Sequence, residues 1–215
     1  MISQSKAIVI KSFSYSESSL ISRLLLENGE KLSLMIKGAK NLKNNKSVLF
    51  ESMNFIDFNY YNRSNRDMQL FKEGVLVNNF SNLKGNFDRM KYGLCIIDII
   101  DKALPKDYQD HQMFNIAYKC LKKIDKNENY KITFLFFLLS FSHFNGYSFN
   151  SFKINNLDSE KALDLFINSY NNMEYYEMID HLKEIDLDML IKKTIIFIKT
   201  SIPEISYVKS LKFIN

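Results

Sequence analysis

The spacing of apolar residues along this chain changes once, near residue 82. Before that point, apolar positions form short runs or alternate with polar ones, as Leu32, Leu34 and Ile36 do. A period of two is typical of strands with one buried face. The pattern predicts strands over residues 6–11, 20–26, 31–37, 56–60 and 68–71, the last with an apolar run at 75–77 close behind. The Asn28-Gly29 pair predicts a tight turn between the second and third strands.

Beyond residue 82 the apolar residues recur every three or four positions, which is the spacing of a buried helix face. Such stripes run over residues 87–104, 113–124, 163–170 and 190–198. The run 132–139 is apolar on all sides, so we expect it to be the central helix of a bundle that ends at Gly146. Pro105 and Pro203 mark the ends of the first and last stripes.

These patterns predict an α+β protein in which strands come first and helices follow. Five short strands with tight connections fit an OB-fold barrel over residues 1–80, and a helical domain would then occupy residues 81–215. A bare sandwich is the competing architecture for the strands. No low-complexity linker separates the two parts, so we expect barrel and bundle to pack directly on each other.

The distribution of charged residues along the chain indicates which kind of molecule it binds. The chain has 29 Lys and Arg against 24 Asp and Glu, a net charge of +5, and most of this excess lies before Pro105. One stretch without acids carries four lysines at a spacing of three, which are Lys37, Lys40, Lys43 and Lys46. Lysines on a turn between strands bind phosphates and release counterions regardless of base sequence. We expect this turn to contact nucleic acid, with a solvated loop as the alternative.

Other cations and aromatic rings extend this hypothesis. Arg63 and Arg66 lie on the predicted hairpin tip before the last strand, and Arg23 lies on the second strand, where it lines the same surface or pairs with a neighbouring acid. Three aromatic residues are candidates for stacking on bases, with core packing as the alternative: Tyr60, Tyr61 and Phe71.

Other function classes find no support. The sequence has no Walker loop, nucleophile elbow or paired carboxylates in a polar context, so an enzyme is not expected. Asp98 and Asp101 share a helix face, where we expect them to pair with lysines. Cys95 and Cys120 lie in helical patterns and are expected to be buried thiols, and the three histidines have no ligand spacing. Without a secretory signal or a bilayer-length apolar run, a soluble, cytoplasmic protein is expected.

Several segments together carry a resemblance to a family. Residues 6–11, Tyr15, the Glu17-Ser18 pair, Gly29 and residues 37–40 resemble the opening of the RecO family of bacterial recombination mediators. Residues 68–80 resemble the last barrel strand of that family and lead into its first long helix. Residues 208–213 resemble its closing segment. The resemblance covers most of the first half and the tail, and it rests on the order and spacing of the segments.

The resemblance implies an OB-fold followed by a helical domain that binds single- and double-stranded DNA and anneals complementary strands. It also implies action with RecR and single-stranded DNA-binding protein to load RecA. Many family members carry a four-cysteine zinc site, but the corresponding residues 144–149 contain no cysteine, so neither zinc nor another cofactor is expected. The alternatives are a protein adaptor with incidental DNA binding and an OB-fold RNA-binding protein.

Overall fold

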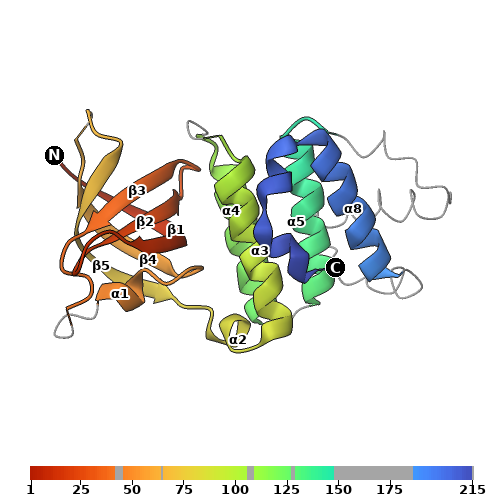
Figure 1. Ribbon diagram of the computed structural model, residues 1–215, viewed down its shortest axis with the longest axis horizontal. Helices are drawn as coiled ribbons and strands as arrows, with labels where there is room; N and C mark the ends of the chain where they lie inside the picture. Colours follow the sequence, from red (N-terminus) through yellow and green to blue (C-terminus); the bar gives the residue numbers. More distant parts are fainter. Residues whose placement is uncertain (42–45, 64, 106–108, 127–128, 148–185, 215) are drawn as a thin grey trace.

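The computed structural model describes residues 1–41, 46–63, 65–105, 109–126, 129–147 and 186–214. A barrel of strands forms one end of the molecule and a group of helices forms the other (Figure 1). The strands are β1 (Ile2–Ser14), β2 (Leu20–Leu26), β3 (Lys31–Ile36), β4 (Phe55–Tyr61) and β5 (Met68–Asn78). The helices are α1 (Lys46–Leu49), α2 (Ser81–Lys84), α3 (Phe87–Ala103), α4 (His111–Asp125), α5 (Tyr130–Phe144) and α8 (Leu187–Ser201), followed by the 3-10 helices η2 (Pro203–Tyr207) and η3 (Lys209–Phe213).

The strands close into a barrel in the order β1-β2-β3-β5-β4. Strand β1 pairs antiparallel with both β2 and β4, and a parallel pairing of β3 with β5 closes the ring. A register shift between Val9 and Lys11 bends β1, so that its first half follows β4 and its second half follows β2. This five-stranded, OB-like arrangement confirms the predicted fold class, and the sandwich alternative is wrong.

The alternation in β3 is observed as expected, with Leu32, Leu34 and Ile36 facing the barrel interior. Phe58 and Phe71 fill the same interior with Tyr60. Tyr60 and Phe71 each expose only 8% of their surface. The hypothesis that these two rings stack on bases is therefore wrong, because both belong to the barrel core.

A second core joins the barrel to the helices. Ile8, Leu25 and Phe55 on the outer face of the barrel belong to one apolar cluster with Phe80 and with the buried faces of α3, α4, α5 and α8. Helix α5 is buried along most of its length, as the all-round apolar run predicts. The expectation of direct packing between barrel and helices is confirmed.

Other details differ from the sequence-based expectations. Strand β5 is continuous through residues 71–75, and β1 begins four residues before the predicted segment, at Ile2. The expected apolar stripe at 163–170 lies outside the described residues. The short helices α1 and α2 and the two 3-10 helices carry too few residues to show a period, and the sequence analysis missed them.

Candidate nucleic-acid interface

A hollow of about 380 Å³ lies on the barrel where β3 ends and β5 begins. Lys37 directly follows β3, Tyr61 is the last residue of β4, and Arg63 and Arg66 lie in the loop between β4 and β5. All four line the hollow, together with Met35, Asp67, Met68, Gln69 and Leu70. The structure therefore brings Lys37 close to two arginines that lie almost thirty positions later in the sequence. It also places an exposed aromatic ring among these three cations.

The β4–β5 loop is held from within by Gln69, which is buried. Its side-chain oxygen accepts a hydrogen bond of 2.8 Å from the backbone N–H of Arg63. Its side-chain amide donates to the carbonyls of Arg63, at 3.0 Å, and Arg66, at 2.8 Å. One amide thus fixes the backbone on both sides of the loop tip, and both arginine side chains remain exposed. Sequence reasoning missed Gln69, because this contact exists only once the loop has folded back.

Of the four lysines of the predicted turn, the three that the structure describes do not lie together. Lys37 lines the hollow, whereas Lys40 donates a hydrogen bond of 2.9 Å to the carbonyl of Ser16 in the β1–β2 loop. Lys46 opens α1 and is half-buried, and Lys43 lies outside the described residues. DNA contact by Lys40, Lys43 and Lys46 stays a prediction.

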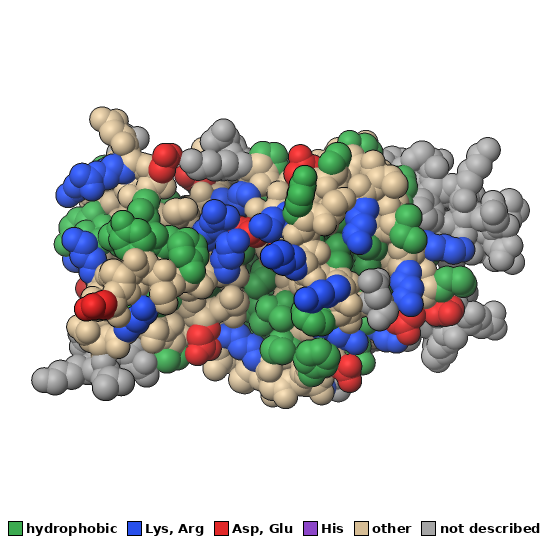
Figure 2. All heavy atoms as spheres, in the orientation of Figure 1, with side chains coloured by type: hydrophobic (Ala, Val, Ile, Leu, Met, Phe, Trp, Pro, Cys, Tyr) green, Lys and Arg blue, Asp and Glu red, His purple; other side chains and the backbone are tan. Residues whose placement is uncertain are grey.

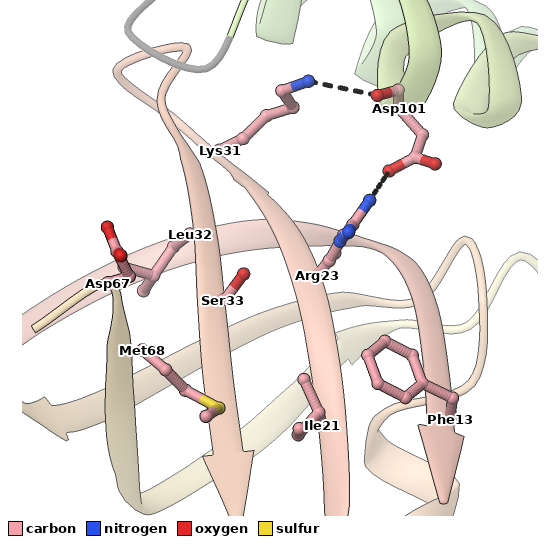
Figure 3. Close-up of a pocket in the computed structure, with 9 residues that line it drawn as sticks. All are labelled: Phe13, Ile21, Arg23, Lys31, Leu32, Ser33, Asp67, Met68 and Asp101. Carbon is pink, nitrogen blue, oxygen red and sulfur yellow. Dashed lines mark hydrogen bonds and ion pairs between the residues drawn. The ribbon is translucent and has the colours of Figure 1, made fainter.

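Arg23 lies on the outer face of β2 and points toward α3 (Figure 3). Its guanidinium Nη1 donates to Oδ1 of Asp101 at 3.0 Å, and Nζ of Lys11 donates to Oδ2 of the same carboxylate at 2.6 Å. The carboxylate is almost fully buried. Burial raises the pKa of Asp101. The hydrogen bonds from Lys11 and Arg23 lower it by a larger amount, so the pKa lies below its ordinary value of 3.8.

The expected pairing of Asp101 with lysine is therefore confirmed, and Arg23 adopts the paired alternative. Asp98 is different, because its carboxylate accepts hydrogen bonds from the backbone N–H of Ser210, at 3.2 Å, and from its hydroxyl, at 2.9 Å. Among the described residues, the expected pairing of Asp98 with lysine is replaced by this contact with η3, which fixes the C-terminal segment on α3.

Lys31 is a further cation at this junction that the sequence analysis did not single out. Its ammonium donates to the carbonyls of Asp101, at 3.1 Å, and Leu104, at 2.5 Å, at the C-terminal end of α3. A cation at that end satisfies carbonyls that the helix leaves without partners. Burial lowers the pKa of Lys31, and the Asp101 charge offsets only part of that effect.

A second hollow, of about 270 Å³, lies between the barrel, α3 and η3. Ile10, Leu94, Ile97 and the exposed ring of Phe213 give it apolar walls, and Lys11, Lys209 and Lys212 line it as well. Figure 2 shows Lys and Arg side chains on one face from the barrel, over the middle of the molecule, to the helices. Lys and Arg side chains are therefore not confined to the barrel, although the sequence places most of the excess charge before Pro105.

The described residues contain no candidate metal site, reactive thiol or membrane-spanning helix. No group of three or more His, Cys, Asp or Glu residues in the described ranges could hold a metal ion. Cys95 and Cys120 are both buried, as expected. Burial raises the pKa of Cys95 to about 12, which leaves it protonated and unreactive at neutral pH. None of the described helices combines the length and the apolar character that crossing a bilayer requires.

Residues 1–80 match the family model described as the N-terminal part of recombination protein O. The chain is similar to the DNA repair protein RecO of Pelodictyon phaeoclathratiforme, with 30% identity over 142 residues, which are 66% of this chain and 54% of that protein. The protein of the same name from Chlorobium limicola is also 30% identical, over 65% of this chain and 54% of its own length.

A more distant relative is the DNA repair protein RecO of Salinibacter ruber, with 25% identity over 58% of this chain and 48% of that protein. The chain thus spans about half the length of the curated relatives it matches.

Proposed function

The chain belongs to the RecO family, and we propose that it binds single- and double-stranded DNA through its barrel and anneals complementary strands during recombinational DNA repair. In this proposal the chain acts as a recombination mediator and not as an enzyme. Annealing needs no bond to be broken. It needs a surface that neutralises two phosphate backbones, so that the strands approach each other at lower electrostatic cost.

The observation that supports this proposal best is the hollow around Tyr61. Lys37, Arg63 and Arg66 surround it, and Gln69 fixes the loop that carries the two arginines. Cations that are held in place lose less entropy when they bind a phosphate than cations on an unrestrained loop. An exposed ring among them adds stacking, which tolerates any base. The hollow therefore suits a nucleic-acid strand of any sequence.

For the protein partners, we propose the RecR protein and single-stranded DNA-binding protein, through which the chain would help load RecA. We assign the acidic, apolar-ended tail of single-stranded DNA-binding protein to the groove between α3 and η3. The exposed ring of Phe213 and the apolar residues Leu94 and Ile97 suit the apolar end of such a tail, and Lys209 and Lys212 suit its acids.

We further propose a division of labour between a DNA-binding domain at residues 1–80 and a helical, partner-binding domain at 81–215, in a cytoplasmic, nucleoid-associated protein. The end of β5 at Asn78 and the start of α2 at Ser81 support this boundary. Because the barrel and the helices share one apolar cluster, we expect the two domains to stay packed on each other. A fragment of residues 1–80 would expose Ile8, Leu25 and Phe55 to water, so we expect it to be less stable than the intact chain.

The test is an annealing assay with two complementary, fluorescently labelled strands and no ATP. We expect the full chain to accelerate pairing of bare strands, and of strands coated with the cognate single-stranded DNA-binding protein. The double variant Arg63→Ala/Arg66→Ala should lose most of this acceleration. The matched control is Lys192→Ala/Lys193→Ala, which removes the same charge from the exposed side of α8.

Three results would contradict the proposal. A chain that neither binds nor anneals bare strands at low salt but still binds its protein partners would be an adaptor. A chain that binds RNA strands much more tightly than DNA strands would be the RNA-binding alternative. Equal loss of annealing in the α8 control and the arginine variant would show that net charge, not the hollow, carries the activity.

A further inference from the structure

The strand register places an apolar row across the outer surface of the barrel. Phe13 of β1 is the pairing partner of Ile21 in β2, Ile21 is the partner of Met35 in β3, and Met35 is the partner of Leu70 in β5. Directly paired residues put their side chains on the same face. Since adjacent strands lie about 4.8 Å apart, the row runs for about 14 Å over four strands.

A second row lies beside the first, two residues along each strand. It is made of Lys11, Arg23, Ser33 and Met68, which are also successive pairing partners. Its two cations lie on the side toward α3, where Lys31 adds a third. The surface thus has an apolar track with positive charge along one edge.

This surface is hollowed. A groove of about 480 Å³ contains Phe13 and Ile21 from the apolar row and Arg23 and Ser33 from the second row. Figure 3 shows Arg23 between the apolar side chains and Asp101. The groove shares Asp67 and Met68 with the hollow around Tyr61, and the apolar row continues into that hollow at Met35 and Leu70. The two hollows therefore form one path.

The charge along this path favours a polyanion. The Asp101 carboxylate faces Lys11 and Arg23, with the ammonium of Lys102 at 3.8 Å. Lys31 and Asp67 also line the groove, so its two cations balance its two acids, and the hollow around Tyr61 then adds Lys37, Arg63 and Arg66, which makes the path as a whole positive. A guanidinium carries five donors, and only one of those of Arg23 is engaged by Asp101 in a hydrogen bond at 3.0 Å. Asp101 thus holds Arg23 in place, and donors remain for a phosphate.

We propose that a DNA single strand crosses β1, β2, β3 and β5 along this path, with its bases on the row from Phe13 to Leu70 and its phosphates at Arg23 and Lys31. This inference rests on the proposed function and extends the interface from the barrel end to the junction with α3. Phe13 is the principal stacking platform, because it is the one aromatic ring of the row and is 44% exposed. The length of the row fits a few bases at a stacking distance of about 3.4 Å.

The experiment measures the affinity of the full chain for short oligodeoxythymidylates. Phe13→Ala should weaken binding about tenfold, which corresponds to about 1.4 kcal/mol and falls in the range for loss of one base–aromatic stack. Phe13→Tyr should bind as the wild type does, because it keeps the ring. The control is Tyr207→Ala, which removes a still more exposed ring from η2 and should have no effect. Thermal unfolding should show that all three variants are folded.

A second readout locates the strand directly. Oligonucleotides that carry 5-iododeoxyuridine should crosslink on irradiation to peptides that contain Phe13, Met35 or Tyr61, and not to the peptide that contains Tyr207. This readout does not depend on a variant, so it remains informative if Phe13→Ala unfolds.

The outcomes separate this inference from the proposed function. If Arg63→Ala/Arg66→Ala weakens binding while Phe13→Ala binds normally and no crosslink reaches Phe13, the strand takes another route from the barrel end and the inference is wrong. If the wild type binds no DNA at low salt, the proposed function itself fails. Equal weakening by Tyr207→Ala and Phe13→Ala would also overturn the assignment of the stacking platform.

Discussion

Lys11 in β1 donates a hydrogen bond of 2.6 Å to the carboxylate of Asp101 in α3, which lies ninety residues later in the chain. The other carboxylate oxygen accepts from Arg23 in β2 at 3.0 Å. The side chain of Asp101 is 1% exposed, and those of its two partners are 38% and 46% exposed. One buried carboxylate thus joins two strands of the barrel to the first long helix.

We predict that Asp101→Asn destabilises the protein. Removal of the charge leaves two cations beside a buried amide, and breaking a buried ion pair costs several kcal/mol when the remaining charge stays buried. Because both cations reach water, we expect a smaller loss of about 2 kcal/mol in the free energy of unfolding, measured by urea titration. The control is Asp88→Asn, whose exposed carboxylate pairs with Lys91. A loss no larger than that of the control would contradict the role given to Asp101.

The same residue predicts a pH dependence. Its hydrogen bonds from Lys11 and Arg23 hold its pKa below the ordinary value in the folded state. An acid whose pKa is depressed by folding stabilises the protein above its unfolded pKa of about 3.9, and this stabilisation disappears as pH falls through the folded pKa. The stability difference between wild type and Asp101→Asn should therefore be constant from pH 7 to pH 5 and shrink below about pH 4. An unchanged difference down to pH 3 would be incompatible with the depressed pKa.

The tip of the β2–β3 hairpin supplies a second test of the junction. Gly29 has a φ of +88°, and a Cβ at this position would lie 2.2 Å from the carbonyl oxygen of Asp110, just before α4. Gly146 has a similar φ of +81°, but no atom of the described residues lies within 4 Å of the equivalent Cβ. Gly146→Ala should cost about 1 kcal/mol from backbone strain alone, and Gly29→Ala clearly more. Equal costs in thermal or urea unfolding would mean that the hairpin tip does not pack against this segment.

The role of the β4–β5 loop can be tested through Gln69, whose side chain bonds the backbone of the loop that carries Arg63 and Arg66. Gln69→Ala removes three hydrogen bonds and should reduce stability by about 1–2 kcal/mol. It should also weaken binding of single-stranded DNA at least about threefold, because Arg63 and Arg66 lose their fixed positions. Gln112→Ala, at an exposed position in α4, is the control. Normal affinity in a folded Gln69→Ala protein would show that the loop needs no such support.

The barrel and the central helix could be predicted from sequence because burial imposes a period. Leu32, Leu34 and Ile36 alternate since one face of β3 is inside the barrel, and α5 is apolar all round since helices surround it. The site could be predicted only in part. Arg63 and Arg66 were found from their place on a hairpin tip, but the spacing of the lysines after β3 says nothing about the direction in which each side chain points.

Gln69, Lys31 and Phe13 were missed for a common reason. Each acquires its place from a contact that only the folded chain makes: Gln69 from a loop that folds back, Lys31 from the end of α3, and Phe13 from its register with Ile21. Pairing register depends on which strands meet and on the bulge in β1, and neither leaves a local pattern in the sequence.

The measurement that tests the central claim most directly is the salt dependence of single-stranded DNA binding. Each phosphate contact with a single strand contributes about −0.7 to the slope of log affinity against log salt concentration. If Lys37, Arg63 and Arg66 each contact a phosphate, the variant with all three changed to alanine should show a slope that is flatter than the wild type by about 2. The Lys192→Ala/Lys193→Ala control should keep the wild-type slope. A folded triple variant with unchanged slope and affinity would contradict the claim that DNA binds at this end of the barrel.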